Sequence, residues 1–110
     1  MEIKTALSSF SALSQQTRLD VFRLLIKAGA DGLLAGELGE QLDVRQNTMS
    51  ANLSVLLNAG LVRNERQGRT IRYFADFDAV RGLLVFLMED CCGGRPELCQ
   101  PIIDELACAC

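Results

Sequence analysis

Apolar side chains recur every three or four residues through the first sixty positions of the chain, which is the period of an α-helix. The spacing predicts a first helix over residues 3–13. A second helix is expected between Ser14, whose hydroxyl can cap its first turn, and Gly29, which can end it. The apolar faces of these two helices are expected to comprise Ile3, Leu7, Phe10 and Leu13, and then Leu19, Phe22, Leu25 and Ile26.

Two further helical segments, residues 34–42 and 45–58, meet at a short break at Asp43 and Val44. Residues four apart share one face of a helix, so each segment has one apolar stripe. Val44 can fill the corner between the stripes. The pattern therefore predicts a helix, a tight turn and a second helix. The stripes comprise Leu38 and Leu42 in the first segment, and Met49, Leu53, Leu56 and Leu57 in the second.

After Ala59 and Gly60 the apolar period changes from helical to alternating, which is typical of β-strands. Residues 61–66 and 70–74 flank Gln67-Gly68, and glycine tolerates the positive φ of a hairpin turn. Helix, turn, helix and hairpin follow one another in the order of a winged helix-turn-helix. We expect a mainly α fold with a two-stranded β-wing and the element order α-α-α-α-β-β-α. Tyr73 is expected to pack within the wing.

A last helix is expected after Asp76, with Asp78 as the N-cap. This segment is apolar almost all round, and such a helix needs a cover on two sides. A fully buried central helix is the alternative, but 110 residues hardly enclose one. We therefore expect a homodimer through the terminal helices. Residues 1–90 are expected to form the winged helix-turn-helix and dimerisation domain, and residues 91–110 a cysteine-rich C-terminal tail. The dimerisation residues are predicted to be Leu7, Phe10, Leu83, Leu84 and Leu87.

Polar side chains crowd the start of the second helix of the predicted motif, and positive charges follow on the hairpin. Residues 45–75 have a net charge of +4, whereas the segments before and after have −2 and −5. Amide and hydroxyl groups can contact bases and phosphates, and a basic wing suits the phosphate backbone or the minor groove. Considered alone, the polar start of this helix also fits an ordinary solvated surface. The positive charges on the following hairpin favour a nucleic-acid interface instead. We expect operator DNA to be contacted by Arg45, Gln46, Asn47, Thr48, Ser50, Arg63, Arg66, Arg69 and Arg72.

Composition narrows the classes of protein. No run of 18 apolar residues could cross a membrane, and the first residues lack the pattern of a signal peptide, so we expect a cytoplasmic protein without a membrane partner. The chain has no histidine, no paired-carboxylate motif and no phosphate-binding loop. We therefore expect no enzyme and no organic cofactor. The five cysteines are expected to be reduced thiols rather than structural disulfides.

All five cysteines fall within the last 20 residues. The glycines and the proline between them can bend the chain so that Cys99 returns toward Cys91 and Cys92. Three thiolates suit a soft ion, and trivalent arsenic or antimony binds three of them as a pyramid. Zinc prefers four ligands, for which Cys108 or Cys110 could supply the fourth.

Other interpretations of the cysteines remain open. Cysteines near a terminus can be exposed and unordered. The vicinal pair can also take part in redox sensing by disulfide exchange with Cys99.

The motifs described so far resemble the ArsR/SmtB family of metal-responsive repressors. The resemblance is carried by residues 12–19 (ALSQQTRL), 46–50 (QNTMS), 56–62 (LLNAGLV) and 68–73 (GRTIRY), and it covers about residues 5–90. It implies a homodimeric winged-helix repressor that leaves its operator when an inducer binds.

Branches of that family place the inducer site differently. One branch uses a Cys-x-Cys pair where this chain has Leu34 and Gly36, and another uses histidines, which are absent. The arsenite-responsive branch has a Cys-Cys pair after the dimerisation helix and one more cysteine further on, and Cys91, Cys92 and Cys99 resemble that pattern. The resemblance thus implies trivalent arsenic or antimony as the inducer. Vicinal thiols also suit methylated trivalent arsenic.

The sequence therefore predicts a dimeric repressor that dissociates from operator DNA when the C-terminal thiolates bind As(III) or Sb(III). The alternatives are a thiol-based redox repressor on the same scaffold, and a repressor responsive to methylated arsenic or another soft metal. A metal-buffering protein whose winged helix binds only protein is disfavoured by the basic charge of residues 45–75.

Overall fold

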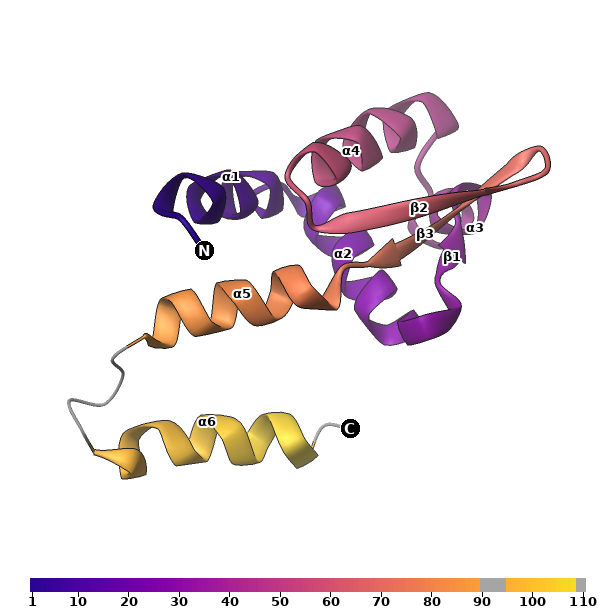
Figure 1. Cartoon of the computed structure of the whole chain (residues 1–110). Coiled ribbons are helices and arrows are strands. Elements are labelled where there is room, and N and C mark those ends of the chain that lie inside the picture. Colours follow the sequence, from indigo (N-terminus) through magenta and orange to yellow (C-terminus); the bar gives the residue numbers. More distant parts are fainter. Residues whose placement is uncertain (90–94, 109–110) are drawn as a thin grey trace.

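The computed structural model describes residues 1–89 and 95–108 of the chain. Figure 1 shows helices grouped around a long hairpin, with α5 running out from the end of the hairpin and α6 drawn apart from the other helices. The described elements are α1 (Ile3–Leu13), α2 (Gln16–Ala28), the 3₁₀ turn η1 (Gly29–Asp31), β1 (Leu33–Leu34), α3 (Ala35–Leu42), α4 (Gln46–Asn58), β2 (Val62–Gln67), β3 (Thr70–Ala75), α5 (Phe77–Met88) and α6 (Pro96–Cys108).

The expected break between the two helices of the motif is confirmed. Asp43 ends α3 in the left-handed conformation, with φ of 53°, and the Val44 amide donates to the carbonyl oxygen of Gly39 at 2.9 Å. Aspartate is one of the few residues that adopt this conformation readily. At the other end of α3, the Leu34 amide donates to the Glu37 carboxylate at 2.8 Å. Both ends of this short helix are therefore held by local hydrogen bonds.

The core lies where α2, α3 and α4 meet the hairpin, and it includes most of the apolar residues predicted from the helical spacing. Leu19 is an exception, since it is 42% exposed although it was expected in the buried stripe of α2. It lies about 120° around the helix from the fully buried Leu25, so it points away from the core. Val21 is buried in its place. The side chains with almost no exposure include Val21, Leu25, Leu38, Met49, Leu53, Leu56 and Leu61.

The three strands form an antiparallel sheet in the order β1-β3-β2. The expected two-stranded wing corresponds to β2 and β3, and β1 is a third strand that was not predicted. β2 and β3 form the predicted hairpin, whose last pair is Gln67 with Thr70, and Gly68 in the turn has φ of 64°. β1 pairs Leu33 with Tyr73. Because β1 has two residues, it is too short to show an alternating pattern. Tyr73 is buried, as expected.

The N-cap of α5 is Asp76, which lies two residues before the predicted cap, Asp78. The carboxylate of Asp76, and not that of Asp78, accepts from the Ala79 amide at 3.1 Å. Asp78 instead forms an exposed ion pair with Arg81. Both aspartates have the right chemistry for a cap, and the turn from β3 decides which one takes the position.

The two sides of α5 differ in burial, as a dimerisation helix requires. Leu83 is buried in the protomer's own core, whereas Leu84, Val85 and Leu87 are 44%, 62% and 57% exposed. The alternative of a central helix enclosed by its own chain is therefore excluded. α6 was not predicted, since it contains Pro101, which lacks the backbone donor of a helix interior. No helix within the described residues is long and apolar enough to cross a membrane.

Candidate nucleic-acid interface and thiol site

The first turn of α4 presents polar side chains to solvent. Arg45 is the N-cap residue, and Gln46, Asn47, Thr48 and Ser50 are all exposed. The first turn of α4 has no acidic residue. The first backbone N–H groups of a helix have no partner within it and carry partial positive charge, so this end of α4 can approach a phosphate.

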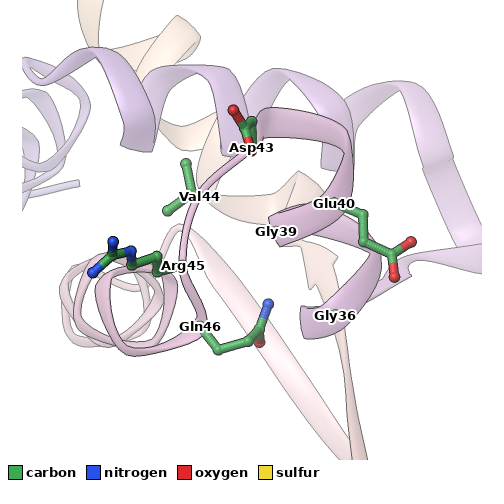
Figure 2. Close-up of a pocket in the computed structure, with 7 residues that line it drawn as sticks. All are labelled: Gly36, Gly39, Glu40, Asp43, Val44, Arg45 and Gln46. Atoms are coloured by element: carbon green, nitrogen blue, oxygen red, sulfur yellow. The ribbon is translucent and has the colours of Figure 1, made fainter.

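Gln46 lies differently from its neighbours, because its side chain turns back toward α3. Its Nε2 donates to the carbonyl oxygen of Ala35 at 3.4 Å, and its amide packs over Gly39. An open groove of about 650 Å³ lies between α3 and α4. In Figure 2 the Gln46 amide extends toward the α3 glycines, and Arg45 points away from them. Glu40 and Asp43 also line this groove, so its charge disfavours phosphate.

The four wing arginines fall into two pairs. The Arg63 guanidinium lies 4.3 Å from the centre of the Phe74 ring and 3.7 Å from the Glu65 carboxylate. Arg72 donates to the Gln67 side chain at 3.1 Å and to the carbonyl oxygen of Asp31 at 3.2 Å. These contacts hold Arg63 and Arg72 against the protein.

Arg66 and Arg69 lie near the tip of the hairpin, and both are exposed. Neither side chain makes a hydrogen bond or an ion pair with residues 1–89 or 95–108. A second groove, of about 430 Å³, lies between the wing, α3 and α4, and Ser50 of α4 and Arg69 line it together with Glu37 and Glu40 of α3. The structure therefore brings Ser50 and Arg69 onto one surface.

One buried polar group in α4 was not predicted. Asn52 is 9% exposed and lies on the apolar face of the helix, where its Nδ2 donates to the carbonyl oxygen of Thr48 at 3.1 Å. Its Oδ1 accepts from the Arg18 guanidinium of α2 at 3.2 Å. The signal in the sequence is a lone asparagine at helical spacing between Met49, Leu53 and Leu56.

Most of the predicted thiol site lies outside the described residues. Cys91, Cys92 and Cys110 are not described, and for Cys108 only the backbone is. Cys99 lies in the first turns of α6, is 8% exposed and is disulfide-bonded. Within residues 1–89 and 95–108, no three Cys, Asp or Glu side chains form a group that could hold a metal ion. A disulfide-bonded sulfur has no thiolate to offer, so Cys99 can bind a metalloid only after reduction.

Comparison with known proteins identifies the family. A helix-turn-helix domain model matches residues 13–65. The uncharacterized HTH-type transcriptional regulator YbzH of Bacillus subtilis is 31% identical over 90 residues, which are 71% of this chain and 90% of that protein. The arsenical resistance operon repressor of the same organism is 34% identical over 75 residues, which are 68% of this chain and 70% of that protein. The chain belongs to the ArsR family of winged-helix transcriptional regulators.

Solved structures agree with this membership in the ArsR family. An ArsR-like transcriptional regulator from Rhodococcus sp. RHA1 has a TM-score of 0.70 at 27% identity, over 94% of this chain and 93% of that one. A homodimeric winged helix-turn-helix DNA-binding domain from Mycobacterium bovis, Mb0332, has a TM-score of 0.65 at 26% identity, over 80% and 81%. The chain is therefore a transcriptional regulator of a DNA-binding family, and its fold is one on which homodimers form.

Proposed function

We propose that this ArsR-family protein is a cytoplasmic repressor that binds operator DNA as a homodimer and dissociates from it when C-terminal thiolates bind As(III) or Sb(III). The observation that carries the DNA-binding part is the exposed polar start of α4, whose first turn has no acidic residue. The exposed Arg66 and Arg69 at the wing tip add positive charge to it. The inducer class is supported by similarity to the arsenical resistance operon repressor of Bacillus subtilis and to a putative arsenical resistance operon repressor of Halobacterium salinarum.

The proposed DNA interface consists mainly of side chains that are exposed at the start of α4 and at the tip of the wing. Asn47, Thr48 and Ser50 lie exposed on the start of α4 and suit base edges and phosphates. Arg66 and Arg69 extend from the wing tip toward the phosphate backbone or the minor groove. The remaining members of the interface are Arg45, Gln46, Arg63 and Arg72.

The proposed dimer interface uses apolar side chains that the protomer leaves exposed. Leu7 of α1 is 61% exposed and Phe10 is 36% exposed, and Leu84, Val85 and Leu87 of α5 add to them. Covering these residues in a second copy removes apolar surface from water. Leu83 supports this surface from inside its own protomer.

For the inducer, we propose that Cys91, Cys92 and Cys99 act as thiolate ligands, with Cys108 and Cys110 as auxiliary thiols. Arsenous acid reacts with three thiols to form three As–S bonds and release three waters, so no oxidant or reductant is consumed. Methylated trivalent arsenic needs two of the thiols. Ligation draws Cys99, at the start of α6, toward the end of α5, and coupling of this kind amounts to about 1–3 kcal/mol.

A second candidate function is redox sensing, and the disulfide at Cys99 favours it. Here two thiols and one hydrogen peroxide would give one disulfide and two waters. Both candidates use the same thiols, and they exclude each other at any one moment because a disulfide sulfur cannot bind As(III).

Fluorescence anisotropy of the fully reduced protein on a labelled operator duplex separates the two functions. Arsenite, antimonite, zinc and peroxide are titrated separately. Release by arsenite or antimonite at about one equivalent per subunit, with a loss of affinity of about 5- to 150-fold, is expected. Release by peroxide alone would refute the proposal of a metalloid-responsive repressor and would support the redox-sensing repressor.

Cysteine variants refine the same experiment. Cys92→Ser and Cys99→Ser are expected to bind the operator like the wild-type protein and to ignore arsenite. Cys108→Ser removes an auxiliary thiol only and is expected to keep the arsenite response, which separates the auxiliary thiols from the three ligands. A full arsenite response in Cys99→Ser would refute the three-thiolate site.

A further inference from the structure

The reading helix α4 contains one buried polar side chain, Asn52, and both ends of its amide are bonded. Burying an amide costs free energy unless it is hydrogen-bonded. The Nδ2 of Asn52 donates to the Thr48 carbonyl oxygen at 3.1 Å, and its Oδ1 accepts from Arg18 Nη1 at 3.2 Å. Because arginine only donates, the amide has one orientation that satisfies both partners.

Arg18 contacts a third helix as well. Its Nε donates to the carbonyl oxygen of Ala12 at 2.6 Å, in the last turn of α1. Its own backbone amide donates to the Gln15 side chain at 2.9 Å, which caps α2. One guanidinium therefore joins the end of α1 to the middle of α4, and Figure 1 shows the junction of α1 and α2 beside α4.

We infer that Arg18 is a positioning residue for DNA reading, which holds α4 at a fixed angle to α1 through Asn52. The inference rests on the proposed function, because it assigns α4 to the DNA and α1 to the dimer interface. The bond from Asn52 to Thr48 carries the constraint to the exposed turn that includes Ser50. Since α1 also carries Leu7 and Phe10, the arrangement of the two subunits sets the angle at which each α4 meets the groove.

The fork geometry of arginine makes this role separable from its charge. A lysine at position 18 keeps the positive charge, but a single ammonium cannot reproduce the planar fork that reaches Ala12 and Asn52 together. Arg23 on the same helix is an exposed control, because its side chain makes no hydrogen bond or ion pair with the described residues.

The test uses Arg18→Lys, Asn52→Leu, the double variant and Arg23→Lys in the full-length protein. The duplex is one that the wild-type protein selects from a random library, and an unrelated duplex serves as the non-specific reference. Circular dichroism and urea titration establish a temperature at which every variant is folded. We expect Arg18→Lys and Asn52→Leu to bind the selected duplex about tenfold more weakly, to bind the unrelated duplex unchanged, and to keep the salt dependence of the wild-type protein.

The double variant adds an internal check. If Arg18 and Asn52 act through one bridge, the double variant binds the selected duplex no more weakly than the weaker of the two single variants. The control Arg23→Lys is expected to bind like the wild-type protein. A folded Arg18→Lys protein with wild-type affinity and only lower stability would overturn the inference and leave the proposed function standing. A wild-type protein that selects no duplex at all would refute the proposed function, and this inference with it.

Discussion

Gly39 is the residue at which the turn between α3 and α4 is most sensitive to one added methyl group. A Cβ at this position would lie 2.9 Å from the backbone carbonyl oxygen of Val44 and would overlap the Gln46 amide. The Gln46 side chain can move away, but the Val44 backbone belongs to the turn itself. Gly36 is one turn earlier in α3, and a Cβ there meets nothing within 4 Å.

The two Gly→Ala substitutions are therefore expected to have opposite effects on stability. Alanine in a helix is favoured over glycine by about 0.5–1 kcal/mol, so Gly36→Ala should stabilise the protein by about that amount. Gly39→Ala gains the same stabilisation from helix propensity, but displacing the Val44 backbone in the turn costs about 1–3 kcal/mol. Losing the weak bond from Gln46 to Ala35 costs about 0.5 kcal/mol more. Because both variants gain the same helix-propensity term, the free energy of unfolding of Gly39→Ala should be lower than that of Gly36→Ala by about 1.5–3.5 kcal/mol.

Urea titration of both variants, followed by circular dichroism at one protein concentration, measures this difference. The fixed concentration matters because a dimer is stabilised by mass action. Operator affinity is measured for the same two variants. The affinity should fall in Gly39→Ala, because the start of α4 is displaced, and should be unchanged in Gly36→Ala. Equal stability of the two variants would show that the turn has room for a side chain, which would refute the close packing of Gly39 against Val44.

Five further substitutions test three separate parts of the structure. Val85→Glu should convert the dimer to a monomer in sedimentation analysis with little loss of secondary structure, since this side chain is 62% exposed, and a dimer that survives would argue against the α5 interface. Arg66→Ala and Arg69→Ala should each reduce the slope of log affinity against log salt by about 1, whereas unchanged slopes would remove the wing tip from the DNA interface. Leu25→Ala should destabilise the protein by about 2–5 kcal/mol in urea titration, and comparable damage from Leu19→Ala would contradict the exposure of Leu19.

The elements that the sequence predicted correctly are those whose signals are local. The helices around Leu38 and Leu56 follow from apolar residues at a spacing of three and four, and the hairpin follows from Gly68 between alternating residues. β1 was missed because two residues have no measurable period, and α6 was missed because Pro101 normally marks the end of a helix.

The parts of the site that could not be predicted depend on contacts between distant residues. Arg18 and Asn52 are 34 positions apart, and nothing near either residue indicates the other. The sequence likewise predicted the same DNA-contacting role for all four arginines of the wing. Only the fold distinguishes Arg63, held over Phe74, from Arg69, which lies at the tip.

In the proposed repressor, α5 would connect the thiols at the end of the chain to DNA binding at α4. Leu83 on one side of α5 is buried in the body of the protomer, and Leu87 on another side is left exposed for a second copy. Because only Glu89 and Asp90 separate Cys91 from the end of α5, bonding Cys91 or Cys92 to Cys99 would constrain the last turn of α5. A metalloid and a disulfide would therefore act through the same helix, and the reading helices would respond only as far as the subunits move. It follows that a Val85→Glu monomer should bind arsenite through its cysteines without any accompanying change in its DNA affinity.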